Sequence, residues 1–348
     1  MSIHEPKFSS LVRQLSWIHN FLILIKVFLL GLMLLHADHS YAQVGGGLEG
    51  SVVALAIDPQ TPATLYAGTG GGVYKSTDSG RQWTAISRGL ADRNVEAIAI
   101  DPLTSTILYA GTYGGMFKSM DGGGSWAPIN SGLPANTHPY TLVVDPLTTT
   151  TLYMGSGDGI FKSSDSGQHW AAINLGLTDV KTNALVINPT TPTILYAGML
   201  DHGVFRSTNS GKSWAATNTG LTDLQIRVLA IVPQSSQILY AGTGGGIFTS
   251  TDAGKHWTAC NNGFPITADI TSVVIHPTNP QTLYVGTDQG VFKSTNAGKQ
   301  WSVSNRGLSD LTIEAFAIDP QTPLILYVGT ANGIMKSTNG GESWDTVK

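Results

Sequence analysis

The chain has 348 residues, with 19 Lys and Arg against 23 Asp and Glu, a formal net charge of −4. This balance argues against nucleic acid or an anionic lipid surface as a partner, because both need a basic contact face. The single cysteine, Cys260, excludes an intramolecular disulfide and a thiolate metal site, and its place in an expected strand indicates a buried, inert thiol. Charged residues make up only 12% while Gly is abundant, which is typical of strand-rich repeats with tight turns.

The first 42 residues have the composition of an export signal. Basic residues between Lys7 and Lys26 precede the apolar run Val27–Leu35, and a short polar stretch then ends in Ala42. This pattern predicts a secretory signal peptide over residues 1–42, cleaved after Ala42, and hence a secreted or periplasmic protein. An uncleaved membrane anchor is the alternative, although the apolar run is shorter than the roughly 20 residues that span a bilayer. Residues 43–348 are expected to form one domain.

One short phrase recurs through the rest of the chain and always ends in tryptophan. These residues, 43 or 44 positions apart, are Trp83, Trp126, Trp170, Trp214, Trp257, Trp301 and Trp344. A period of this length is typical of repeats that cannot bury their apolar face alone and stack on copies of themselves. It also argues against catalysis by any residue present in all seven units, because a catalytic residue is needed once.

Each repeat carries four strand signals separated by turn residues. In the first repeat these are Val52–Ile57, Thr64–Gly68, Val73–Ser76 and Trp83–Ser87. Short strands at regular spacing predict an antiparallel all-β array, and four strands in each of seven units predict a seven-bladed β-propeller. The expected blades cover residues 51–88, 95–130, 139–174, 182–218, 226–261, 270–305 and 313–348. Because each blade has its full set of strands, the ring is expected to close by blade-to-blade packing, with no strand exchanged between the termini.

The first strand of each repeat is expected to lie nearest the propeller axis. One of its faces carries small side chains such as Ala54 and Ala56, and the other carries Leu55 and its counterparts. Alternation places these on opposite sides of the sheet, and small side chains suit the crowded centre of a ring. The recurring Trp is expected to fill the space between neighbouring sheets, because an indole buries about 150–250 Å².

The recurring phrase, which we call the Ser-to-Trp motif, reads Ser-x-Asp/Asn-x-Gly-x-x-Trp. Its third position holds Asp in four repeats and Asn in three: Asp78, Asp121, Asp165, Asp252, Asn209, Asn296 and Asn339. Asp and Asn accept the same backbone N–H bonds but differ as acids, so this position is interpreted as a turn cap rather than a metal ligand or a catalytic group. The motif resembles the Asp-box, or bacterial neuraminidase repeat. That resemblance places it on the hairpin between the third and fourth strands of a propeller blade.

Function in such a ring is expected where the seven repeats differ. One column at the entrance of the first strand varies: Val53, Glu96, Tyr140, Asn183, Arg227, Thr271 and Glu314. Alternation places this column on the face of the large apolar residues. The hairpins between the second and third strands should open at the same end, and they carry Tyr113, Asp158, Asp201, His202 and Asp288. Convergent polar groups at one mouth of the ring indicate a binding site; a solvated channel mouth without a ligand is the alternative.

Two carboxylates of this column, Glu96 and Glu314, could form a glycosidase pair. They belong to the second and seventh repeats, with the first repeat between them. Glycoside hydrolysis by two carboxylates needs a separation of about 5–10 Å. A central channel mouth could bring the pair near that range, and the sequence alone does not define the distance.

Two enzyme families share the Asp-box. Sialidases bind the substrate carboxylate with three arginines, and no such set stands out among Arg81, Arg88, Arg93, Arg206, Arg227 and Arg306. Repeats with Leu-Tyr-Ala-Gly-Thr followed by Lys-Ser-Thr-Asp-x-Gly-x-x-Trp resemble those of xyloglucanase-type hydrolases, which place a cleft between two propellers, whereas this chain has room for one. In size, blade count and export signal the chain resembles the photosystem II stability and assembly factor family, whose members are non-enzymatic propellers. The basic patch of that family has no counterpart in this acidic sequence.

The sequence therefore predicts a monomeric, non-enzymatic scaffold outside the cytoplasm that holds a protein or a glycan at the variable mouth. The expected contact residues are Glu96, Tyr140, Asn183, Arg227, Thr271, Glu314, Tyr113, Asp201 and His202. No cofactor, metal or nucleic acid is expected. Association with a membrane is expected only through an uncleaved N-terminal segment. A glycoside hydrolase of the Asp-box superfamily, xyloglucanase- or sialidase-like, is the alternative, with Glu96 and Glu314 as its carboxylates.

Overall fold

The computed structural model describes residues 43–44 and 47–347. The expected signal peptide, residues 1–42, lies outside these residues, and its cleavage stays a prediction. All the regular elements of the described segments are strands. These segments contain no helix long and apolar enough to cross a bilayer.

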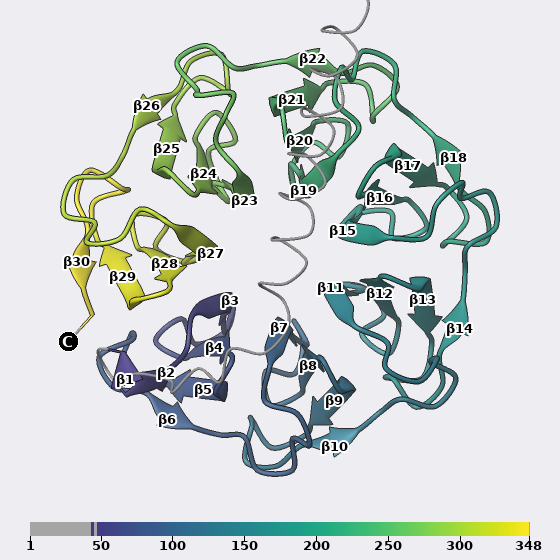
Figure 1. Ribbon diagram of the computed structural model, residues 1–348, viewed down its shortest axis with the longest axis vertical. Helices are drawn as coiled ribbons and strands as arrows, with labels where there is room; N and C mark the ends of the chain where they lie inside the picture. The colour runs from purple at the N-terminus through teal and green to yellow at the C-terminus, as the bar shows by residue number, and fades with distance from the viewer. Residues whose placement is uncertain (1–42, 45–46, 348) are drawn as a thin grey trace, which may run out of the picture. The chain divides into compact units, whose positions relative to one another are not determined.

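Seven four-stranded antiparallel sheets make up the domain, each built from four consecutive strands. Figure 1 shows them as blades around a common axis, numbered here from 1 to 7 in chain order. The innermost strands are β3 (Val52–Ile57), β7 (Val95–Ile100), β11 (Pro139–Val144), β15 (Thr182–Ile187), β19 (Ile226–Ile231), β23 (Ile270–Ile275) and β27 (Ile313–Ile318). The second strands are β4 (Leu65–Thr69), β8 (Leu108–Thr112), β12 (Leu152–Ser156), β16 (Leu195–Met199), β20 (Leu239–Thr243), β24 (Leu283–Thr287) and β28 (Leu326–Thr330).

The remaining strands complete each blade toward its outer edge. The third strands are β5 (Gly72–Ser76), β9 (Gly115–Ser119), β13 (Gly159–Ser163), β17 (Gly203–Ser207), β21 (Gly246–Ser250), β25 (Gly290–Ser294) and β29 (Gly333–Ser337). The outer strands are β6 (Thr84–Ala85), β10 (Ala127–Pro128), β14 (Ala171–Ala172), β18 (Ala215–Ala216), β22 (Thr258–Ala259), β26 (Ser302–Val303) and β30 (Asp345–Thr346). The prediction of a seven-bladed propeller with four antiparallel strands per blade is confirmed.

The core of the domain lies between neighbouring blades. At the first junction, Tyr66 and Val73 of blade 1 pack with Leu108 and Trp126 of blade 2 in one buried cluster. The second strand of each blade is buried along its whole length, because it lies in the middle of its sheet and has a neighbouring blade on each side. Each blade therefore depends on its two neighbours for burial of its apolar side chains.

Small residues on the forward face of each blade let the next blade approach closely. A Cβ added to Gly68, which lies beside Ala54, would come within 2.7 Å of Val95 Cγ1 in blade 2 and 3.2 Å of Ile98 Cδ1. The large side chains of an innermost strand thus pack backward onto the small face of the preceding blade. Close packing of this kind leaves no room for larger residues without a shift of the backbone.

The motif tryptophan lies between two blades. Trp126 of blade 2 is 5% exposed, and its Nε1–H donates to the carbonyl of Ile86 in blade 1 at 2.6 Å. The same bond to the preceding blade, at 2.7–2.8 Å, is made by Trp170, Trp214, Trp257, Trp301 and Trp344. Burial of an indole contributes at most about 4–6 kcal/mol at 25 cal/mol/Å².

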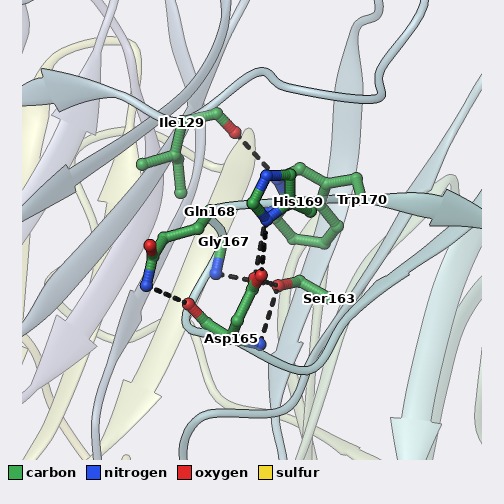
Figure 2. A network of polar contacts seen from close by, with 7 residues as sticks. All are labelled: Ile129, Ser163, Asp165, Gly167, Gln168, His169 and Trp170. Carbon is green, nitrogen blue, oxygen red and sulfur yellow. Dashed lines mark hydrogen bonds and ion pairs between the residues drawn. The ribbon is translucent and has the colours of Figure 1, made fainter.

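The Ser-to-Trp motif forms the turn between the third and outer strands, as Figure 2 shows for blade 3. Ser163 Oγ donates to Asp165 Oδ1 at 2.8 Å and accepts from the N–H of Gly167 at 2.8 Å. Asp165 Oδ1 also accepts from the N–H of His169 at 2.9 Å. Gly167 has a φ of +89°, where a side chain would strain the backbone.

Asparagine makes the same turn in blade 4. Asn209 Oδ1 accepts from Ser207 Oγ at 2.9 Å and from the N–H of Ser213 at 3.0 Å. The oxygen that organises the turn is thus common to both residue types, and the charge of the aspartate is not needed for the geometry.

Blade 7 packs on blade 1 through the contacts that join the other blades. Tyr327 Oη and Lys336 Nζ both donate to the carbonyl of Ser79, at 3.2 and 3.3 Å. Since every described blade consists of consecutive strands, the ring closes by packing between sheets, as expected.

The packing of blade 1 extends ahead of the expected start at residue 51. A two-stranded sheet of β1 (Gln43–Val44) and β2 (Leu48–Glu49) precedes β3. Leu48 is fully buried in the cluster between blades 7 and 1, beside Tyr327. The corresponding Leu90 packs in the cluster between blades 1 and 2. The Gly-Leu pair that precedes each innermost strand, or Gly-Phe before β23, is therefore part of the packing between blades.

Candidate functional site

A β-bulge interrupts every innermost strand close to its start. Pairing skips one residue between Val52 and Ala54 in β3, and the same shift occurs in the other six blades. The skipped residues are the variable column: Val53, Glu96, Tyr140, Asn183, Arg227, Thr271 and Glu314. A bulge leaves its extra residue outside the hydrogen-bonded ladder and redirects its side chain. We call these seven positions the bulge column.

The bulge turns members of this column to the face opposite to the one expected. Strict alternation placed them on the large-residue face, which packs onto the preceding blade. Asn183 Nδ2 instead donates to the carbonyl of Ile226 in the following blade at 3.1 Å. Thr271 Oγ1 likewise donates to the carbonyl of Ile313 at 2.7 Å. The expectation was wrong because a bulge shifts the two-residue alternation by one. Both side chains tie neighbouring innermost strands together.

Two sets of loops gather around the bulge column. They are the segments that lead into the innermost strands and the hairpins between the second and third strands, and we call this end of the ring the mouth face. The N–H of Tyr113, in the β8–β9 hairpin, donates to the carbonyl of Asn94 at 3.1 Å. The N–H of Asp288 donates to the carbonyl of Asp269 at 3.2 Å. These bonds place the hairpins and the lead-in segments at one end, as expected.

Glu96 lies in a polar and aromatic cluster on the mouth face. Burial raises the pKa of its carboxyl, and a hydrogen bond with Tyr113 acts in the opposite direction. The Tyr113 ring stacks on His138 with centroids 4.3 Å apart. Tyr113 and Tyr140 are 40% and 44% exposed. The cluster thus presents aromatic surface to solvent beside a carboxyl that holds its proton more tightly than usual.

Glu314 of blade 7 is the second half-buried carboxyl of the bulge column. Burial raises its pKa, the charges of Asp310 and Glu96 raise it further, and a hydrogen bond with Ser51 opposes the rise. The charge of Glu96, in blade 2, thus reaches the Glu314 carboxyl.

Three other expected contact residues are exposed on the mouth face. Arg227 Nη2 lies 3.6 Å from Asp269 Oδ1, and His202 Nδ1 lies 3.3 Å from Asp179 Oδ2. Asp201, beside His202, is exposed. Exposed ion pairs contribute about 0–1 kcal/mol to stability, so the Arg227 guanidinium can exchange Asp269 for a group on a ligand.

The acidic charge of the domain is concentrated on the mouth face. The acidic residues of its loops and bulges are Glu49, Asp92, Glu96, Asp158, Asp179, Asp201, Asp223, Asp269, Asp288, Asp310 and Glu314. The basic residues at this end are Arg93, Lys181 and Arg227. Arg88 and Arg306 lie instead beside the motif tryptophans of the following blades, whose backbone N–H groups donate to their carbonyls. Eleven acidic against three basic residues give this face a formal charge of −8, whereas the rest of residues 47–347 carries ten acidic and twelve basic residues. The field of the mouth face therefore attracts cations and opposes anions.

Pairs of carboxylate and imidazole occur at two motif turns. His169 Nδ1 lies 2.7 Å from Asp165 Oδ2, and His256 Nδ1 lies 2.6 Å from Asp252 Oδ2, all on exposed turns. Within the part of the chain that the structure describes, no group of three or more His, Cys, Asp or Glu side chains could hold a metal ion.

A pocket between blades 5 and 6 was missed from the sequence. It has a volume of about 390 Å³, and its lining includes Tyr240, Thr249, Cys260 and Ala297. Burial raises the pKa of the Cys260 thiol to about 12, so the thiol stays neutral at physiological pH. The sequence does hold a signal for this pocket, because Thr249 stands where the other six repeats have Lys or Arg.

The arrangement of seven four-stranded blades defines the class of protein as a seven-bladed β-propeller. No protein-family model matches the chain, and no curated protein matches it. Similar solved structures include the GH74 xyloglucanase from Xanthomonas campestris, with a TM-score of 0.75 and 21% identity over 88% of this chain and 55% of that one. The chain thus spans about half the length of that enzyme.

Two further structures are similar to this chain. The extracellular domain of the putative one component system BT4673 from B. thetaiotaomicron has a TM-score of 0.69 and 17% identity, over 86% of this chain and 40% of that one. YCF48 bound to D1 peptide has a TM-score of 0.65 and 13% identity, over 87% of this chain and 97% of that one. Identities this low show a common fold and no more.

Proposed function

We propose that this protein is an Asp-box propeller that acts outside the cytoplasm as a binding or assembly scaffold and holds a protein or glycan partner at the mouth face. The observation that carries the proposal is the bulge column, in which seven otherwise similar repeats present different side chains at one end of the ring. A bulge frees a side chain from the ladder without altering the rest of the blade. This column can therefore vary while the fold is retained, as a recognition surface requires. The export signal expected over residues 1–42 supports the location.

Exposed apolar side chains support a protein as the partner. Those on the mouth face, 38–58% exposed, are Tyr113, Tyr140, Val180, Leu224, Ile266 and Leu311. Aromatic residues are enriched in the cores of protein interfaces. The formal charge of −8 on the same face would steer a basic partner toward it and would oppose an anionic glycan.

Two of the similar structures support the proposal, one for the location outside the cytoplasm and one for binding. One is an extracellular domain of a putative one component system, and YCF48 was solved with a D1 peptide. The match covers 97% of the YCF48 chain, so nearly all of that chain corresponds to a single propeller. The peptide is a property of YCF48, and the partner of the present chain is to be found by experiment.

Two exposed apolar residues of blade 3 provide a matched test of the mouth face. Tyr140, at the start of β11, is 44% exposed, and Leu147, beyond its other end, is 63% exposed. A partner captured by crosslinking from the extracellular or envelope fraction is expected to bind Tyr140→Ser at least tenfold more weakly, since truncating a hot-spot residue costs about 2 kcal/mol or more. Leu147→Ser should bind like the wild type. Equal effects of the two substitutions would contradict a site at the mouth.

A glycoside hydrolase is the second candidate, and it is favoured by two half-buried carboxyls of raised pKa in the bulge column, Glu96 and Glu314. Wild type, Glu96→Gln and Glu314→Gln are assayed for release of reducing sugar from xyloglucan, sialosides and a glycan panel. A hydrolase predicts activity that falls about 10²–10⁴-fold in each variant, because general acid–base catalysis contributes about that much. Such a result would replace the scaffold proposal. A wild type that cleaves none of these glycans, together with partner loss in Tyr140→Ser, would exclude the hydrolase.

A further inference from the structure

A lysine and a tyrosine face each other on the second and third strands of most blades. In blade 1, Tyr66 of β4 pairs with Lys75 of β5. The Lys75 ammonium lies 5.4 Å from the centroid of the Tyr66 ring and donates to the carbonyl of Gly122, in the motif turn of blade 2, at 3.1 Å. Cation–π attraction and a charge-assisted hydrogen bond hold the ammonium there. The lysine thus joins its blade to the next one.

The same arrangement recurs at other junctions. Lys162, Lys293 and Lys336 lie 5.2, 5.6 and 5.1 Å from the centroids of their paired tyrosine rings. Their Nζ atoms donate to the carbonyls of Ser210, Gly340 and Ser79 at 3.5, 2.7 and 3.3 Å. The groove beside each of these turns is therefore a site for a primary ammonium, which the chain fills with its own lysine.

Blade 5 keeps the tyrosine but not the lysine. Thr249 stands at the lysine position and pairs with Tyr240, and its Oγ1 donates to the carbonyl of Leu239 at 3.2 Å. The carbonyl of Ala297, in the motif turn of blade 6, accepts from Tyr240 Oη at 3.3 Å. Tyr240, Thr249 and Ala297 all line the pocket of about 390 Å³. Blade 5 therefore keeps the Tyr240 ring and the Ala297 carbonyl, while Thr249 provides no positive charge at the lysine position.

We propose that this pocket binds the ammonium group of a lysine side chain from a partner polypeptide. The ammonium would lie over the Tyr240 ring and donate to the carbonyl of Ala297. The corresponding contacts are made at four other junctions by Lys75, Lys162, Lys293 and Lys336. The four-carbon stem would lie against Ile238, Ala259 and Cys260, which line the same pocket, since lysine buries its stem on apolar surface while the charged end meets polar groups. The site is separate from the mouth face and does not rest on the scaffold proposal.

A lysine that lines the pocket, Lys299, carries a charge that opposes a second cation. Other junctions hold an ammonium in spite of such a neighbour. Burial and the charge of Lys212 lower the pKa of Lys162, while the charge of Asp145 raises it. For Lys336, burial and the charge of Arg81 lower the pKa, while the charges of Asp319 and Asp78 raise it. Both ammonium groups nevertheless make their bonds to the neighbouring turn. Each of these two ammonium groups has a carboxylate near it as well as a cation, whereas Val232 of blade 5 stands at the position of Asp145 and Asp319. A lysine bound in the pocket would therefore be held against the repulsion of Lys299 by the Tyr240 ring and the Ala297 carbonyl.

The width of the groove depends on the residue that follows the outer strand. Blades 1 to 3 carry Ile86, Ile129 and Ile173 at this position, and blade 5 carries Cys260. The smaller side chain leaves more space beside Tyr240. A thiol that burial keeps neutral, with its pKa raised to about 12, adds no anion to the pocket. An isoleucine at residue 260 should therefore narrow the site without changing its charge.

The probe is the peptide acetyl-Gly-Lys-Gly-amide, compared with the same peptide carrying norleucine in place of lysine. Binding to the full chain is followed by NMR shifts of the backbone amides of Thr249 and Ala297. A desolvated cation–π contact contributes about 2 kcal/mol, so the lysine peptide is expected to bind about tenfold or more tightly than the norleucine peptide. Equal binding of the two peptides, or no binding of the lysine peptide, would overturn the proposal.

Variants of the pocket test its location. Thr249→Lys restores the lysine of the other repeats and should weaken binding of the lysine peptide by about tenfold or more. Thr249→Val keeps the pocket open and should bind like the wild type. Thermal unfolding shows whether each variant folds. If Thr249→Lys does not fold, Cys260→Ile is expected to give the same loss. Unchanged affinity in a folded blocking variant would place the lysine elsewhere and overturn the assignment.

Discussion

At the residue scale, a single side-chain oxygen organises each motif turn. In blade 2, Asp121 Oδ1 accepts from Ser119 Oγ at 2.8 Å and from the N–H of Ser125 at 2.9 Å. These bonds to Ser119 and Ser125 lower the pKa of the Asp121 carboxyl to about 2. The pKa of Asp165 and of Asp252 is also lowered to about 2, chiefly by hydrogen bonds from the residue four positions later. Asn fills the same place in three blades. The aspartate carboxylate therefore serves in these turns as a hydrogen-bond acceptor.

These carboxyls predict a loss of stability in acid. Their pKa is lowered from 3.8 to about 2 on folding, so they stabilise the fold above pH 3.8, and this contribution is lost as the pH falls through about 2. The triple substitution Asp121→Asn, Asp165→Asn, Asp252→Asn keeps the acceptor oxygen and removes the titration. Thermal midpoints measured by circular dichroism between about pH 4 and pH 2 should fall more steeply for the wild type than for the triple variant. Parallel slopes would show that the three carboxyls do not contribute.

At the element scale, regular strands are predictable and their irregularities are not. The spacing of the tryptophans and the four strand signals per repeat correctly predicted seven blades, because period and alternation are properties of regular elements. The bulge next to Glu96 breaks that alternation, and no residue type marks it in all seven repeats. The faces of Asn183 and Thr271 were therefore predicted wrongly. The packing of Leu48 between blades has a signal in the sequence, because the Gly-Leu pair recurs before the innermost strands.

The packing of the motif tryptophan between two blades leads to a prediction about stability at the element scale. Trp214, in blade 4, is 5% exposed and donates to the carbonyl of Ile173 in blade 3 at 2.7 Å. Trp214→Ala removes this bond and leaves a cavity between the sheets, which should lower the free energy of unfolding by about 3–5 kcal/mol. Val303→Ala, on the outer strand β26 where the side chain is 65% exposed, is the control and should change it by less than about 0.5 kcal/mol. Denaturant titration measures both, and a similar cost for the two would refute the interpretation.

At the scale of the whole domain, the features that repeat in every blade and the features that vary lie at opposite ends of the propeller axis. The end that carries the motif turns repeats its hydrogen bonds from blade to blade, and it joins each blade to the next. The mouth face carries the bulge column and the formal charge of −8. A partner that binds the mouth contacts the residues least needed for packing, apart from Asn183 and Thr271, which tie innermost strands together. Recognition can therefore change with little cost to the stability of the ring.

The closure between blades 7 and 1 yields the last prediction. Leu48 is fully buried there with Val52 and Tyr327, and it precedes the first blade instead of linking two blades. Leu48→Ala should lower the free energy of unfolding by about 2–5 kcal/mol, because it leaves a cavity in a packed junction.

The strands in which the substitution accelerates hydrogen exchange distinguish a local opening between blades 7 and 1 from general destabilisation of the ring. Loss of packing at one junction opens that junction first, since proteins unfold locally where buried contacts are fewest. In Leu48→Ala, hydrogen exchange should therefore accelerate in β3 and β28, which face each other across the closure, more than in β15. Leu103→Ala, at a residue 64% exposed on blade 2, should leave all three strands unchanged. Uniform acceleration in every blade would mean that the ring unfolds as one unit and that its closure is no weaker than its other junctions.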